Sequence, residues 1–176
     1  MPKIITVYYS RKGENYFNGT IKNLKRGNTE IVAEYIQKVV GGDIFEVETE
    51  RQYSADYYKC TEEAKAELHA NARPALKNYL DNLEEYDVIF VGYPNWWGTM
   101  PMAMFTLLEK YDLSGKKVVP FCTNEGSGMG SSEVDLRRIC RGAEILRGLP
   151  VHGAEAAKSE GKVADWAKRS IEEASK

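Results

Sequence analysis

The sequence has few of the residues that build metal centres or disulfide frameworks. Its 176 residues include only three cysteines and two histidines. Cys60, Cys122 and Cys140 are far apart and odd in number, which excludes a paired disulfide framework and a CxxC metal or redox motif. His69 and His152 lack the short spacing of a histidine metal site. We therefore expect three free, buried thiols and no metal.

A strong excess of charge and long apolar runs are also missing. The formal net charge is −2, so there is no basic surface for nucleic acid and no polybasic membrane anchor. The apolar run at residues 4–8 is too short for the core of a signal peptide, and no small-residue cleavage site follows it. We expect a cytoplasmic protein of one domain, residues 1–176, that binds neither nucleic acid nor membrane.

Short β-rich segments alternate along the chain with patterns of helical period. This alternation predicts an α/β fold in which helices cover both faces of a parallel sheet. With right-handed crossovers, five strands give a three-layer sandwich with the strand order 2-1-3-4-5. The expected strands are residues 4–8, 43–47, 88–91, 117–122 and 144–146, the last with a possible extension over 149–151; the expected helices begin near residues 28, 54, 101, 131 and 163.

Several local features refine these expectations. Gly92 and Pro94 are expected to end the third strand, and Pro120 predicts a bulge or irregularity in the fourth because proline cannot donate a ladder hydrogen bond. Ser131 or Ser132 is expected to cap the fourth helix. Trp166 lies on the apolar stripe of the last helix, which indicates a core residue.

Two adjacent tryptophans follow the third strand. Val88 to Val91 are apolar without alternation, as in a strand that is buried on both faces. Trp96 and Trp97 come after the carboxyl end of that strand, where open α/β sheets bind their ligands. Two large aromatic side chains on a loop indicate either a flat ligand platform or a core or interface contact.

The loops after the first and fourth strands open at the same edge of such a sheet. The first loop offers small polar residues and leads to a helix that starts near Asn28, a pattern typical of an anion site. It lacks the GxxxxGK[ST] sequence of a Walker A loop. The loop at residues 123–130 is rich in glycine but does not match GxGxxG. A phosphate pocket, an aromatic platform and a glycine-rich loop together describe a mononucleotide with a planar ring, and flavin mononucleotide (FMN) fits.

Three motifs give the sequence a resemblance to the flavodoxin family over nearly the whole chain. They are Tyr8 to Arg11 with Gly27-Asn28-Thr29, then Gly92 to Gly98, then Phe121 to Gly128. The resemblance implies the flavodoxin-like sandwich, noncovalent FMN, a phosphate bound by the first loop and a ring held by the other two. The implied cofactor-binding residues are Ser10, Arg11, Lys12, Gly13, Asn15, Asn28, Thr29, Pro94, Asn95, Trp96, Trp97, Gly98, Thr123, Asn124, Glu125, Gly126, Ser127 and Gly128.

The chain departs from the family pattern by an insertion inside the first loop, about residues 12–26. Gly13 and Gly27 compete for the position of the family's loop glycine. The insertion is locally basic, and it is open whether it acts as a flap over the cofactor, as a docking element or as a tolerated surface excursion.

The predicted function is electron transfer through FMN to a redox partner protein, with no catalytic acid or base. An FMN-dependent NAD(P)H:quinone-type oxidoreductase is the alternative, because carriers of this family are usually strongly acidic and this chain is nearly balanced in charge. A phospho-receiver domain is disfavoured, since Tyr93-Pro94 and Tyr9-Ser10 stand where its acidic residues belong. A pure interaction module is a remote alternative. The chain is expected to be a monomer or a homodimer.

Overall fold

A parallel β-sheet forms the centre of the molecule. The computed structural model describes all 176 residues. The sheet order is β4-β1-β5-β6-β7, and the sixth strand, β8, also pairs with β6. All pairings in this sheet are parallel. The strands are β1 (Ile4–Tyr8), β4 (Asp43–Glu46), β5 (Val88–Pro94), β6 (Lys117–Asn124), β7 (Glu144–Ile145) and β8 (Leu149–His152). The predicted order 2-1-3-4-5 is confirmed, with the fifth strand split into two pieces.

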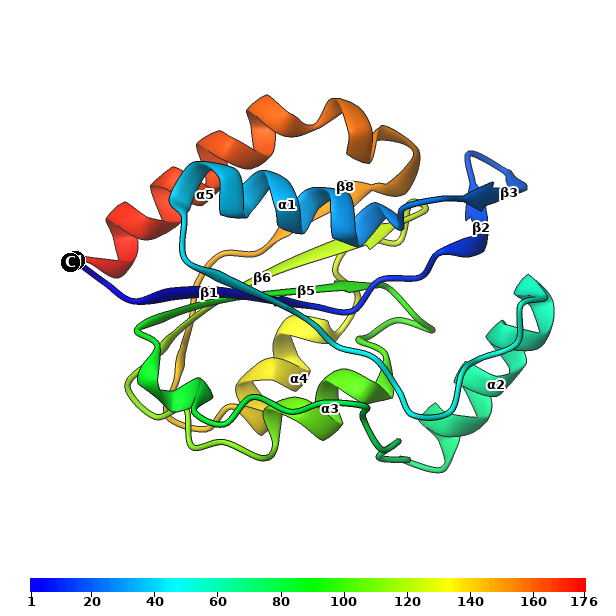
Figure 1. The fold of residues 1–176 in the computed structure, drawn as a ribbon, viewed down its shortest axis with the longest axis horizontal. Coiled ribbons are helices and arrows are strands. Elements are labelled where there is room, and N and C mark those ends of the chain that lie inside the picture. The colour runs from blue at the N-terminus through cyan, green and yellow to red at the C-terminus, as the bar shows by residue number, and fades with distance from the viewer.

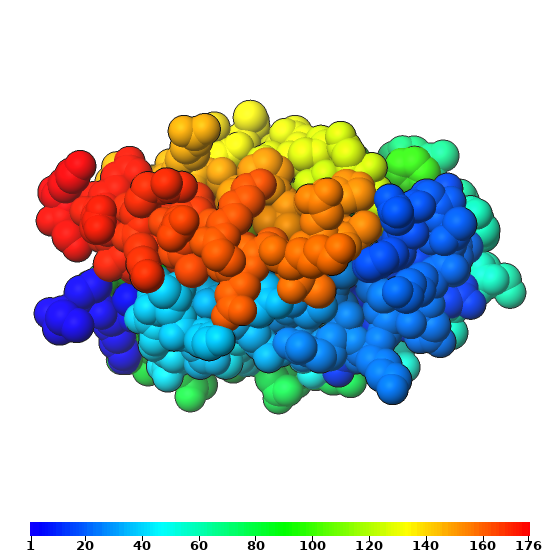
Figure 2. Space-filling model, turned by 90° about the horizontal axis from the view of Figure 1, so that it is seen from above, coloured from blue at the N-terminus to red at the C-terminus, as the bar shows by residue number.

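Helices cover both faces of this sheet (Figure 1). On one face α1 (Asn28–Val40) lies beside α5 (Glu160–Ala174), and Figure 2 shows the two helices forming one continuous layer. On the other face lie α3 (Met102–Leu108) and α4 (Ser132–Ile139), while α2 (Tyr57–His69) extends beyond the end of the sheet. Two short 3₁₀ helices complete the chain, at Leu83–Glu85 and Gly153–Lys158.

Each face of the sheet has its own apolar core. The strand residues alternate between them: Ile89 and Val91 face the α3–α4 side, whereas Val88 and Phe90 face the α1–α5 side. Trp166 of α5 is buried and packs edge-on against Phe90, with the ring centroids 5.7 Å apart. The prediction that Trp166 is a core residue is therefore confirmed.

The insertion in the first loop is a β-hairpin that lies outside the main sheet. Its strands are β2 (Gly13–Phe17) and β3 (Thr20–Leu24), which pair antiparallel. Asn18 and Gly19 form the two-residue turn, with φ values of 53° and 91°. These positive angles at both central residues are those of a type I′ turn, for which Asn-Gly is the preferred sequence. The Asn-Gly pair was thus the sequence signal that identifies the hairpin.

Two sequence-based expectations for the central strands are confirmed only in part. Gly92 does not end the third strand, because β5 continues through it; the strand ends at Pro94, as expected for that residue. Gly92 is needed inside the strand, since a Cβ there would lie 2.1 Å from the Phe121 ring. Pro120 causes no bulge between β5 and β6, where it pairs in register with Val91. The interruption falls on the other side of β6, between β7 and β8, where the neighbouring strand leaves the sheet.

The helix starts also differ from expectation in detail. The second helix begins at Tyr57, close to the expected residue 54, and Asp56 caps it by accepting a hydrogen bond from the Lys59 N–H at 2.9 Å. Ser131 occupies the N-cap position of α4, but its side chain makes no capping bond. The Ser132 hydroxyl instead donates to the Met129 carbonyl oxygen and contacts the Tyr93 hydroxyl. The prediction that a serine side chain caps α4 is therefore wrong.

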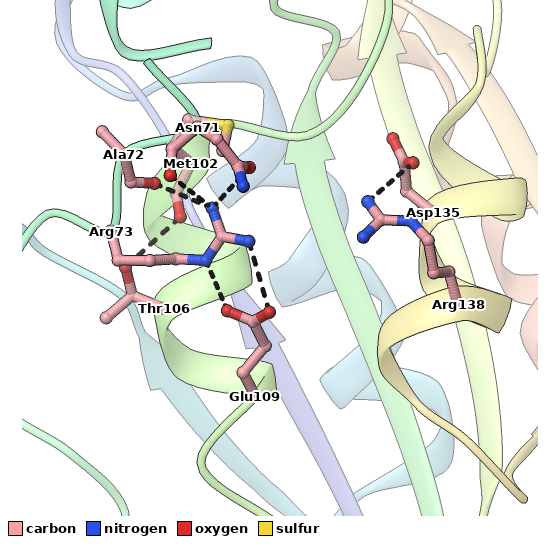
Figure 3. Close-up of polar contacts among 8 residues, drawn as sticks. All are labelled: Asn71, Ala72, Arg73, Met102, Thr106, Glu109, Asp135 and Arg138. Carbon is pink, nitrogen blue, oxygen red and sulfur yellow. Dashed lines mark hydrogen bonds and ion pairs between the residues drawn. The ribbon is translucent and has the colours of Figure 1, made fainter. Parts of the chain in front are cut away.

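Arg73 fastens the segment that follows α2 to helix α3 (Figure 3). Its guanidinium donates to both carboxylate oxygens of Glu109 and to the backbone and side-chain oxygens of Asn71. It also lies 5.2 Å from the centroid of the Phe105 ring. Bidentate pairs of this kind fix orientation as well as distance. Arg73 thereby holds the far end of α2 against the body of the protein.

The remaining global features concern cysteines, metals and membranes. All three cysteines are free and buried, as predicted. No group of three or more histidine, cysteine, aspartate or glutamate side chains is placed to hold a metal ion. None of the helices has the length and apolar character needed to cross a membrane.

Candidate functional site

A cleft of about 580 Å³ lies at the carboxyl ends of β1, β5 and β6. Its size is typical of sites for small molecules and cofactors. The three loops that the sequence singled out all contribute to it, together with the hairpin and α2. The lining residues are Arg11, Asn15, Tyr16, Asn28, Tyr57, Tyr58, Cys60, Thr61, Glu62, Ala64, Pro94, Asn95, Trp96, Trp97, Thr123, Asn124, Glu125, Ser127 and Gly153.

The start of α1 forms one end of this cleft. Gly27 precedes the helix, and a Cβ there would lie only 2.0 Å from the Ser10 hydroxyl, so the close approach of loop and helix requires glycine. The Ser10 hydroxyl accepts a hydrogen bond from the Glu30 N–H at 3.1 Å. The Thr29 N–H has no acceptor among the protein's hydrogen bonds. Free N–H groups and the helix dipole at this position favour an anion.

The structure also settles which glycine stands at the helix start. Gly27 lies directly before Asn28, whereas Gly13 is the first residue of hairpin strand β2. The insertion thus separates Ser10 from the helix in sequence but not in space. Behind the helix start, the Thr29 and Thr123 hydroxyls lie 2.7 Å apart and are buried, which joins the loops after β1 and β6.

The two tryptophans have different environments. Trp96 is partly buried and packs edge-on against the Tyr9 and Tyr53 rings, each with a centroid distance of 5.2 Å. Trp97 is 49% exposed, and its indole N–H donates to the Thr61 carbonyl oxygen of α2 at 2.8 Å. Lys65 Nζ lies 5.3 Å from the centroid of the Trp97 ring. Of the two, Trp97 is the side chain with a free ring surface at the cleft.

The tryptophan loop turns sharply after Trp96. Trp97 and Gly98 both have positive φ, at 56° and 91°, and the Trp96 N–H donates to the Thr99 carbonyl oxygen across the turn. The Gly98 N–H donates to Asn95 Oδ1 at 2.8 Å, and the Gly98 carbonyl oxygen accepts from the Ser131 N–H at 2.7 Å. A left-handed conformation is costly for a residue as large as tryptophan, and such strain is concentrated at functional sites.

The loop after β6 is joined to the tryptophan loop. Asn95 Nδ2 donates to the Gly128 carbonyl oxygen at 2.9 Å. A Cβ on Gly130 would lie 2.2 Å from the Gly98 carbonyl oxygen, so the two loops approach each other through a glycine. Asn124 holds its own loop by accepting from the Gly126 N–H at 2.9 Å. This arrangement leaves Asn124, Glu125 and Ser127 on the cleft.

The hairpin borders the cleft and is fastened to it at several points. Arg11 donates to the carbonyl oxygens of Glu14, Ser54 and Ala55, at 2.9, 3.0 and 3.3 Å. Glu14 Oε1 accepts from the Tyr57 N–H at the start of α2 at 2.8 Å. The Asn18 N–H at the hairpin tip donates to Glu125 Oε2 at 3.3 Å. The hairpin therefore connects α2 to the loop after β6 across one side of the cleft.

Eleven of the residues implied by the resemblance line this cleft, and seven do not. Ser10 caps α1, Gly13 begins β2, and Thr29 is buried behind the helix start. Lys12 and Ser10 lie on a smaller neighbouring recess of about 270 Å³ that also contains Glu46 and Glu48. Gly98, Gly126 and Gly128 contribute turns with positive φ rather than lining surface.

The residues that the hairpin, α2 and the loop after β8 bring to the cleft were not predicted from the sequence. These are Tyr16, Tyr57, Tyr58, Cys60, Thr61, Glu62, Ala64 and Gly153. The predicted strand order contained a signal for the α2 group, because β4 lies next to β1 and its following segment opens at the same edge.

Few charges face the cleft, and they include no free arginine or lysine. Its charged lining residues are Arg11, whose guanidinium is taken up by three carbonyl oxygens, and the carboxylates of Glu62 and Glu125. Glu125 Oε2 lies 3.4 Å from His152 Nε2. Burial raises the pKa of the Cys60 thiol to about 11, so it is protonated at neutral pH. Cys60 is therefore an inert part of the lining at neutral pH.

Comparisons with known proteins agree with this architecture. No curated protein sequence matches the chain at a significant level. Among solved structures, a protein of Bacteroides eggerthii that is provisionally named a flavoprotein is 27% identical, covers 97% of this chain and 99% of its own, and has a TM-score of 0.77. A similarly named protein of Bacteroides uniformis is 29% identical over 95% of this chain and 98% of its own, with a TM-score of 0.74.

A flavoprotein of Lactobacillus acidophilus, solved in complex with FMN, shares the fold. It is 24% identical over 90% of this chain and 98% of its own, with a TM-score of 0.63. The family model described as flavodoxin matches residues 21–170. That match spans most of the chain and includes the tryptophan loop and the loop after β6. The chain therefore belongs to the flavodoxin family, with the flavodoxin-like fold.

Proposed function

We propose that this protein binds FMN noncovalently in the cleft and transfers electrons through it. The observation that carries the proposal is the meeting of three features in one cleft: the anion-favouring start of α1, the exposed ring of Trp97 and the loop after β6. FMN consists of a phosphate, a linker and a planar ring, and each of these features suits one part of it. The cofactor in the Lactobacillus acidophilus structure supports the same choice.

The phosphate would be held mainly by backbone groups. The N-terminal turn of α1 provides N–H donors and a positive dipole end, and Asn28 adds a side-chain amide on the cleft. Arg11 is already engaged by three carbonyl oxygens, so it is not free to act as the principal phosphate ligand. A dianion held by neutral donors needs no lysine.

The isoalloxazine ring would lie against Trp97, with the backbone of the loop after β6 at its polar edge. Once bound, FMN supplies the redox chemistry, and the protein sets its binding and its electrostatic surroundings. Two carboxylates, those of Glu62 and Glu125, line the cleft against one guanidinium, that of Arg11, and this excess disfavours added negative charge in the cleft. This chain should therefore favour the oxidised cofactor and give it a low reduction potential.

The Trp97–Gly98 peptide is the backbone group best placed to respond to the redox state of the ring. Gly98 lacks a Cβ, so its backbone angles can change at little steric cost. In the present conformation the Gly98 N–H is held by Asn95 Oδ1 at 2.8 Å. A flip of this peptide toward the cofactor would break that hydrogen bond.

A second candidate is an FMN-dependent reductase that accepts electrons from NAD(P)H. The observation that favours it is the hairpin, which connects α2 to Glu125 and screens one side of the cleft. A carrier that docks a partner protein needs an open cofactor edge, whereas an enzyme benefits from a partly enclosed one.

The visible absorption spectrum with and without NADPH tests both candidates. The proposal predicts a yellow protein, or a colourless one that turns yellow with added FMN after removal of free cofactor. Bleaching by NADPH alone would identify a reductase, whereas a flavin that is reduced only by dithionite or by a partner protein would identify a carrier. A colourless protein that also fails to retain added FMN would refute both.

A further inference from the structure

We propose that the hairpin and the start of α2 form a tyrosine-lined subsite for an uncharged planar aromatic molecule of the quinone class. The subsite consists of Tyr16 on β2 and of Tyr57 and Tyr58 on α2. It lines the same cleft as the loops expected to hold FMN. The inference therefore rests on the proposed function and names the molecule that exchanges electrons with the cofactor.

Exposed aromatic side chains are concentrated at this one place. Four aromatic residues of the molecule are exposed, namely Tyr16 at 38%, Tyr58 at 62%, Tyr79 at 39% and Trp97 at 49%. All except Tyr79 line the cleft. Large aromatic groups left in water around one cavity indicate a surface that a ligand covers.

The three tyrosines form a continuous set of rings. The Tyr16 and Tyr57 centroids are 5.8 Å apart with an interplanar angle of 37°, and those of Tyr57 and Tyr58 are 5.5 Å apart at 80°. Glu14, which accepts the Tyr57 N–H, fixes the hairpin against α2 and so keeps Tyr16 beside Tyr57. Rings held in this way provide stacking and edge contacts at little cost in side-chain entropy.

The charges of the cleft select against an anionic ligand in this subsite. Glu62 lies one turn after Tyr58 on α2. The Glu125 carboxylate accepts a hydrogen bond from the Asn18 N–H at the tip of the hairpin. The Arg11 guanidinium keeps its positive charge, but its N–H groups donate to backbone carbonyl oxygens and are not available to pair with an anion. Lys65 Nζ lies 5.3 Å from the centroid of the Trp97 ring. An uncharged ring avoids the repulsion of two carboxylates, whereas a sulfonate or a dinucleotide phosphate does not.

Binding to the oxidised, FMN-loaded protein tests this inference without turnover. Menadione, an uncharged naphthoquinone, and 1,4-naphthoquinone-2-sulfonate, a charged relative, are titrated by isothermal calorimetry. We expect menadione to bind at least fivefold more tightly than the sulfonate. Tyr16→Ala and Tyr58→Ala should each weaken menadione binding about fivefold or more, as expected for loss of a stacking ring, while Tyr16→Phe and Tyr58→Phe retain it.

Tyr79→Ala is the matched control, because Tyr79 is as exposed as Tyr16 but lies outside the cleft. It should leave menadione affinity unchanged. The FMN dissociation constant of every variant is measured in parallel and should stay within twofold of the wild type. Unchanged menadione binding in the alanine variants would overturn the inference, and so would equal affinity for the sulfonate.

Weaker FMN binding in Tyr16→Ala or Tyr58→Ala would also overturn it, because the rings would then pack on the cofactor itself. Failure of the proposed function gives a different result: wild-type protein would retain no FMN before any quinone is added.

Discussion

Replacing Trp97 by alanine separates cofactor binding from folding. Trp97 is 49% exposed, so its removal loses only about half of the apolar burial of a core tryptophan, and the Thr61 carbonyl oxygen that it binds can be rehydrated. The lost hydrogen bond contributes about 0.5–1.5 kcal/mol and the contact with Lys65 about 0.5–1 kcal/mol. With the apolar burial of about half a tryptophan side chain added, we expect the free energy of unfolding to fall by about 2–4 kcal/mol.

Trp97→Ala should also weaken FMN binding, by a free energy of similar size. Stacking of a base on an aromatic side chain contributes about 1–3 kcal/mol. This corresponds to a dissociation constant that rises roughly 5-fold to 150-fold. Isothermal calorimetry of FMN into the apoprotein measures the affinity, and urea unfolding followed by circular dichroism measures the stability.

The backbone conformation of Trp97 suggests a second variant, Trp97→Gly, that separates the effect on stability from the effect on FMN binding. Its φ of 56° is strained for alanine as well as for tryptophan, but not for glycine. Trp97→Gly should thus unfold at a higher urea concentration than Trp97→Ala while binding FMN equally weakly. Trp166→Phe is the matched control: Trp166 is buried and donates to the Arg147 carbonyl oxygen, so this variant should lose stability and keep its FMN affinity. FMN affinity of Trp97→Ala within twofold of the wild type would refute the reasoning.

Three further predictions concern the framework of the site. Gly92→Ala should lower the free energy of unfolding, measured by urea titration, by about 1–3 kcal/mol, because its Cβ would lie 2.1 Å from the Phe121 ring. Gly161→Ala, whose Cβ would lie in open space on α5, should leave the free energy of unfolding unchanged. Ser10→Ala should lower it by about 0.5–2 kcal/mol by removing the acceptor of the Glu30 N–H, and an unchanged urea midpoint would contradict that capping role. Burial raises the pKa of Cys60 to about 11, so only about one Cys60 thiol in a thousand is ionised at pH 8. Cys60 in the native protein should therefore react slowly with a thiol reagent, and rapid labelling at pH 8 would contradict this.

The fold could be predicted from the sequence because its signals are local. Val88 to Val91 form an apolar run without alternation, and the structure buries all four on both faces of the sheet. The helix start at Asn28 follows from glycine and the helical period. Gly92 was misjudged because its reason for being in the strand is the Phe121 ring, which is distant in sequence.

The site could be predicted only in part. Trp96 and Trp97 were placed at the cleft by the strand that precedes them, but their difference in exposure depends on Tyr9 and Tyr53, which pack around Trp96 from elsewhere in the chain. The tyrosine-lined subsite was missed because it forms only when the hairpin meets α2. Of the hairpin, the Asn-Gly turn alone was readable from the sequence.

Equilibrium titration of the apoprotein with FMN and with riboflavin is the most direct test of the proposed FMN site. Riboflavin carries the same ring without the phosphate, so the comparison examines the tryptophan loop and the start of α1 in one experiment. We expect one FMN per chain and clearly weaker binding of riboflavin. No binding of FMN would contradict the proposed cofactor, and equal affinity for both compounds would contradict the phosphate site at α1.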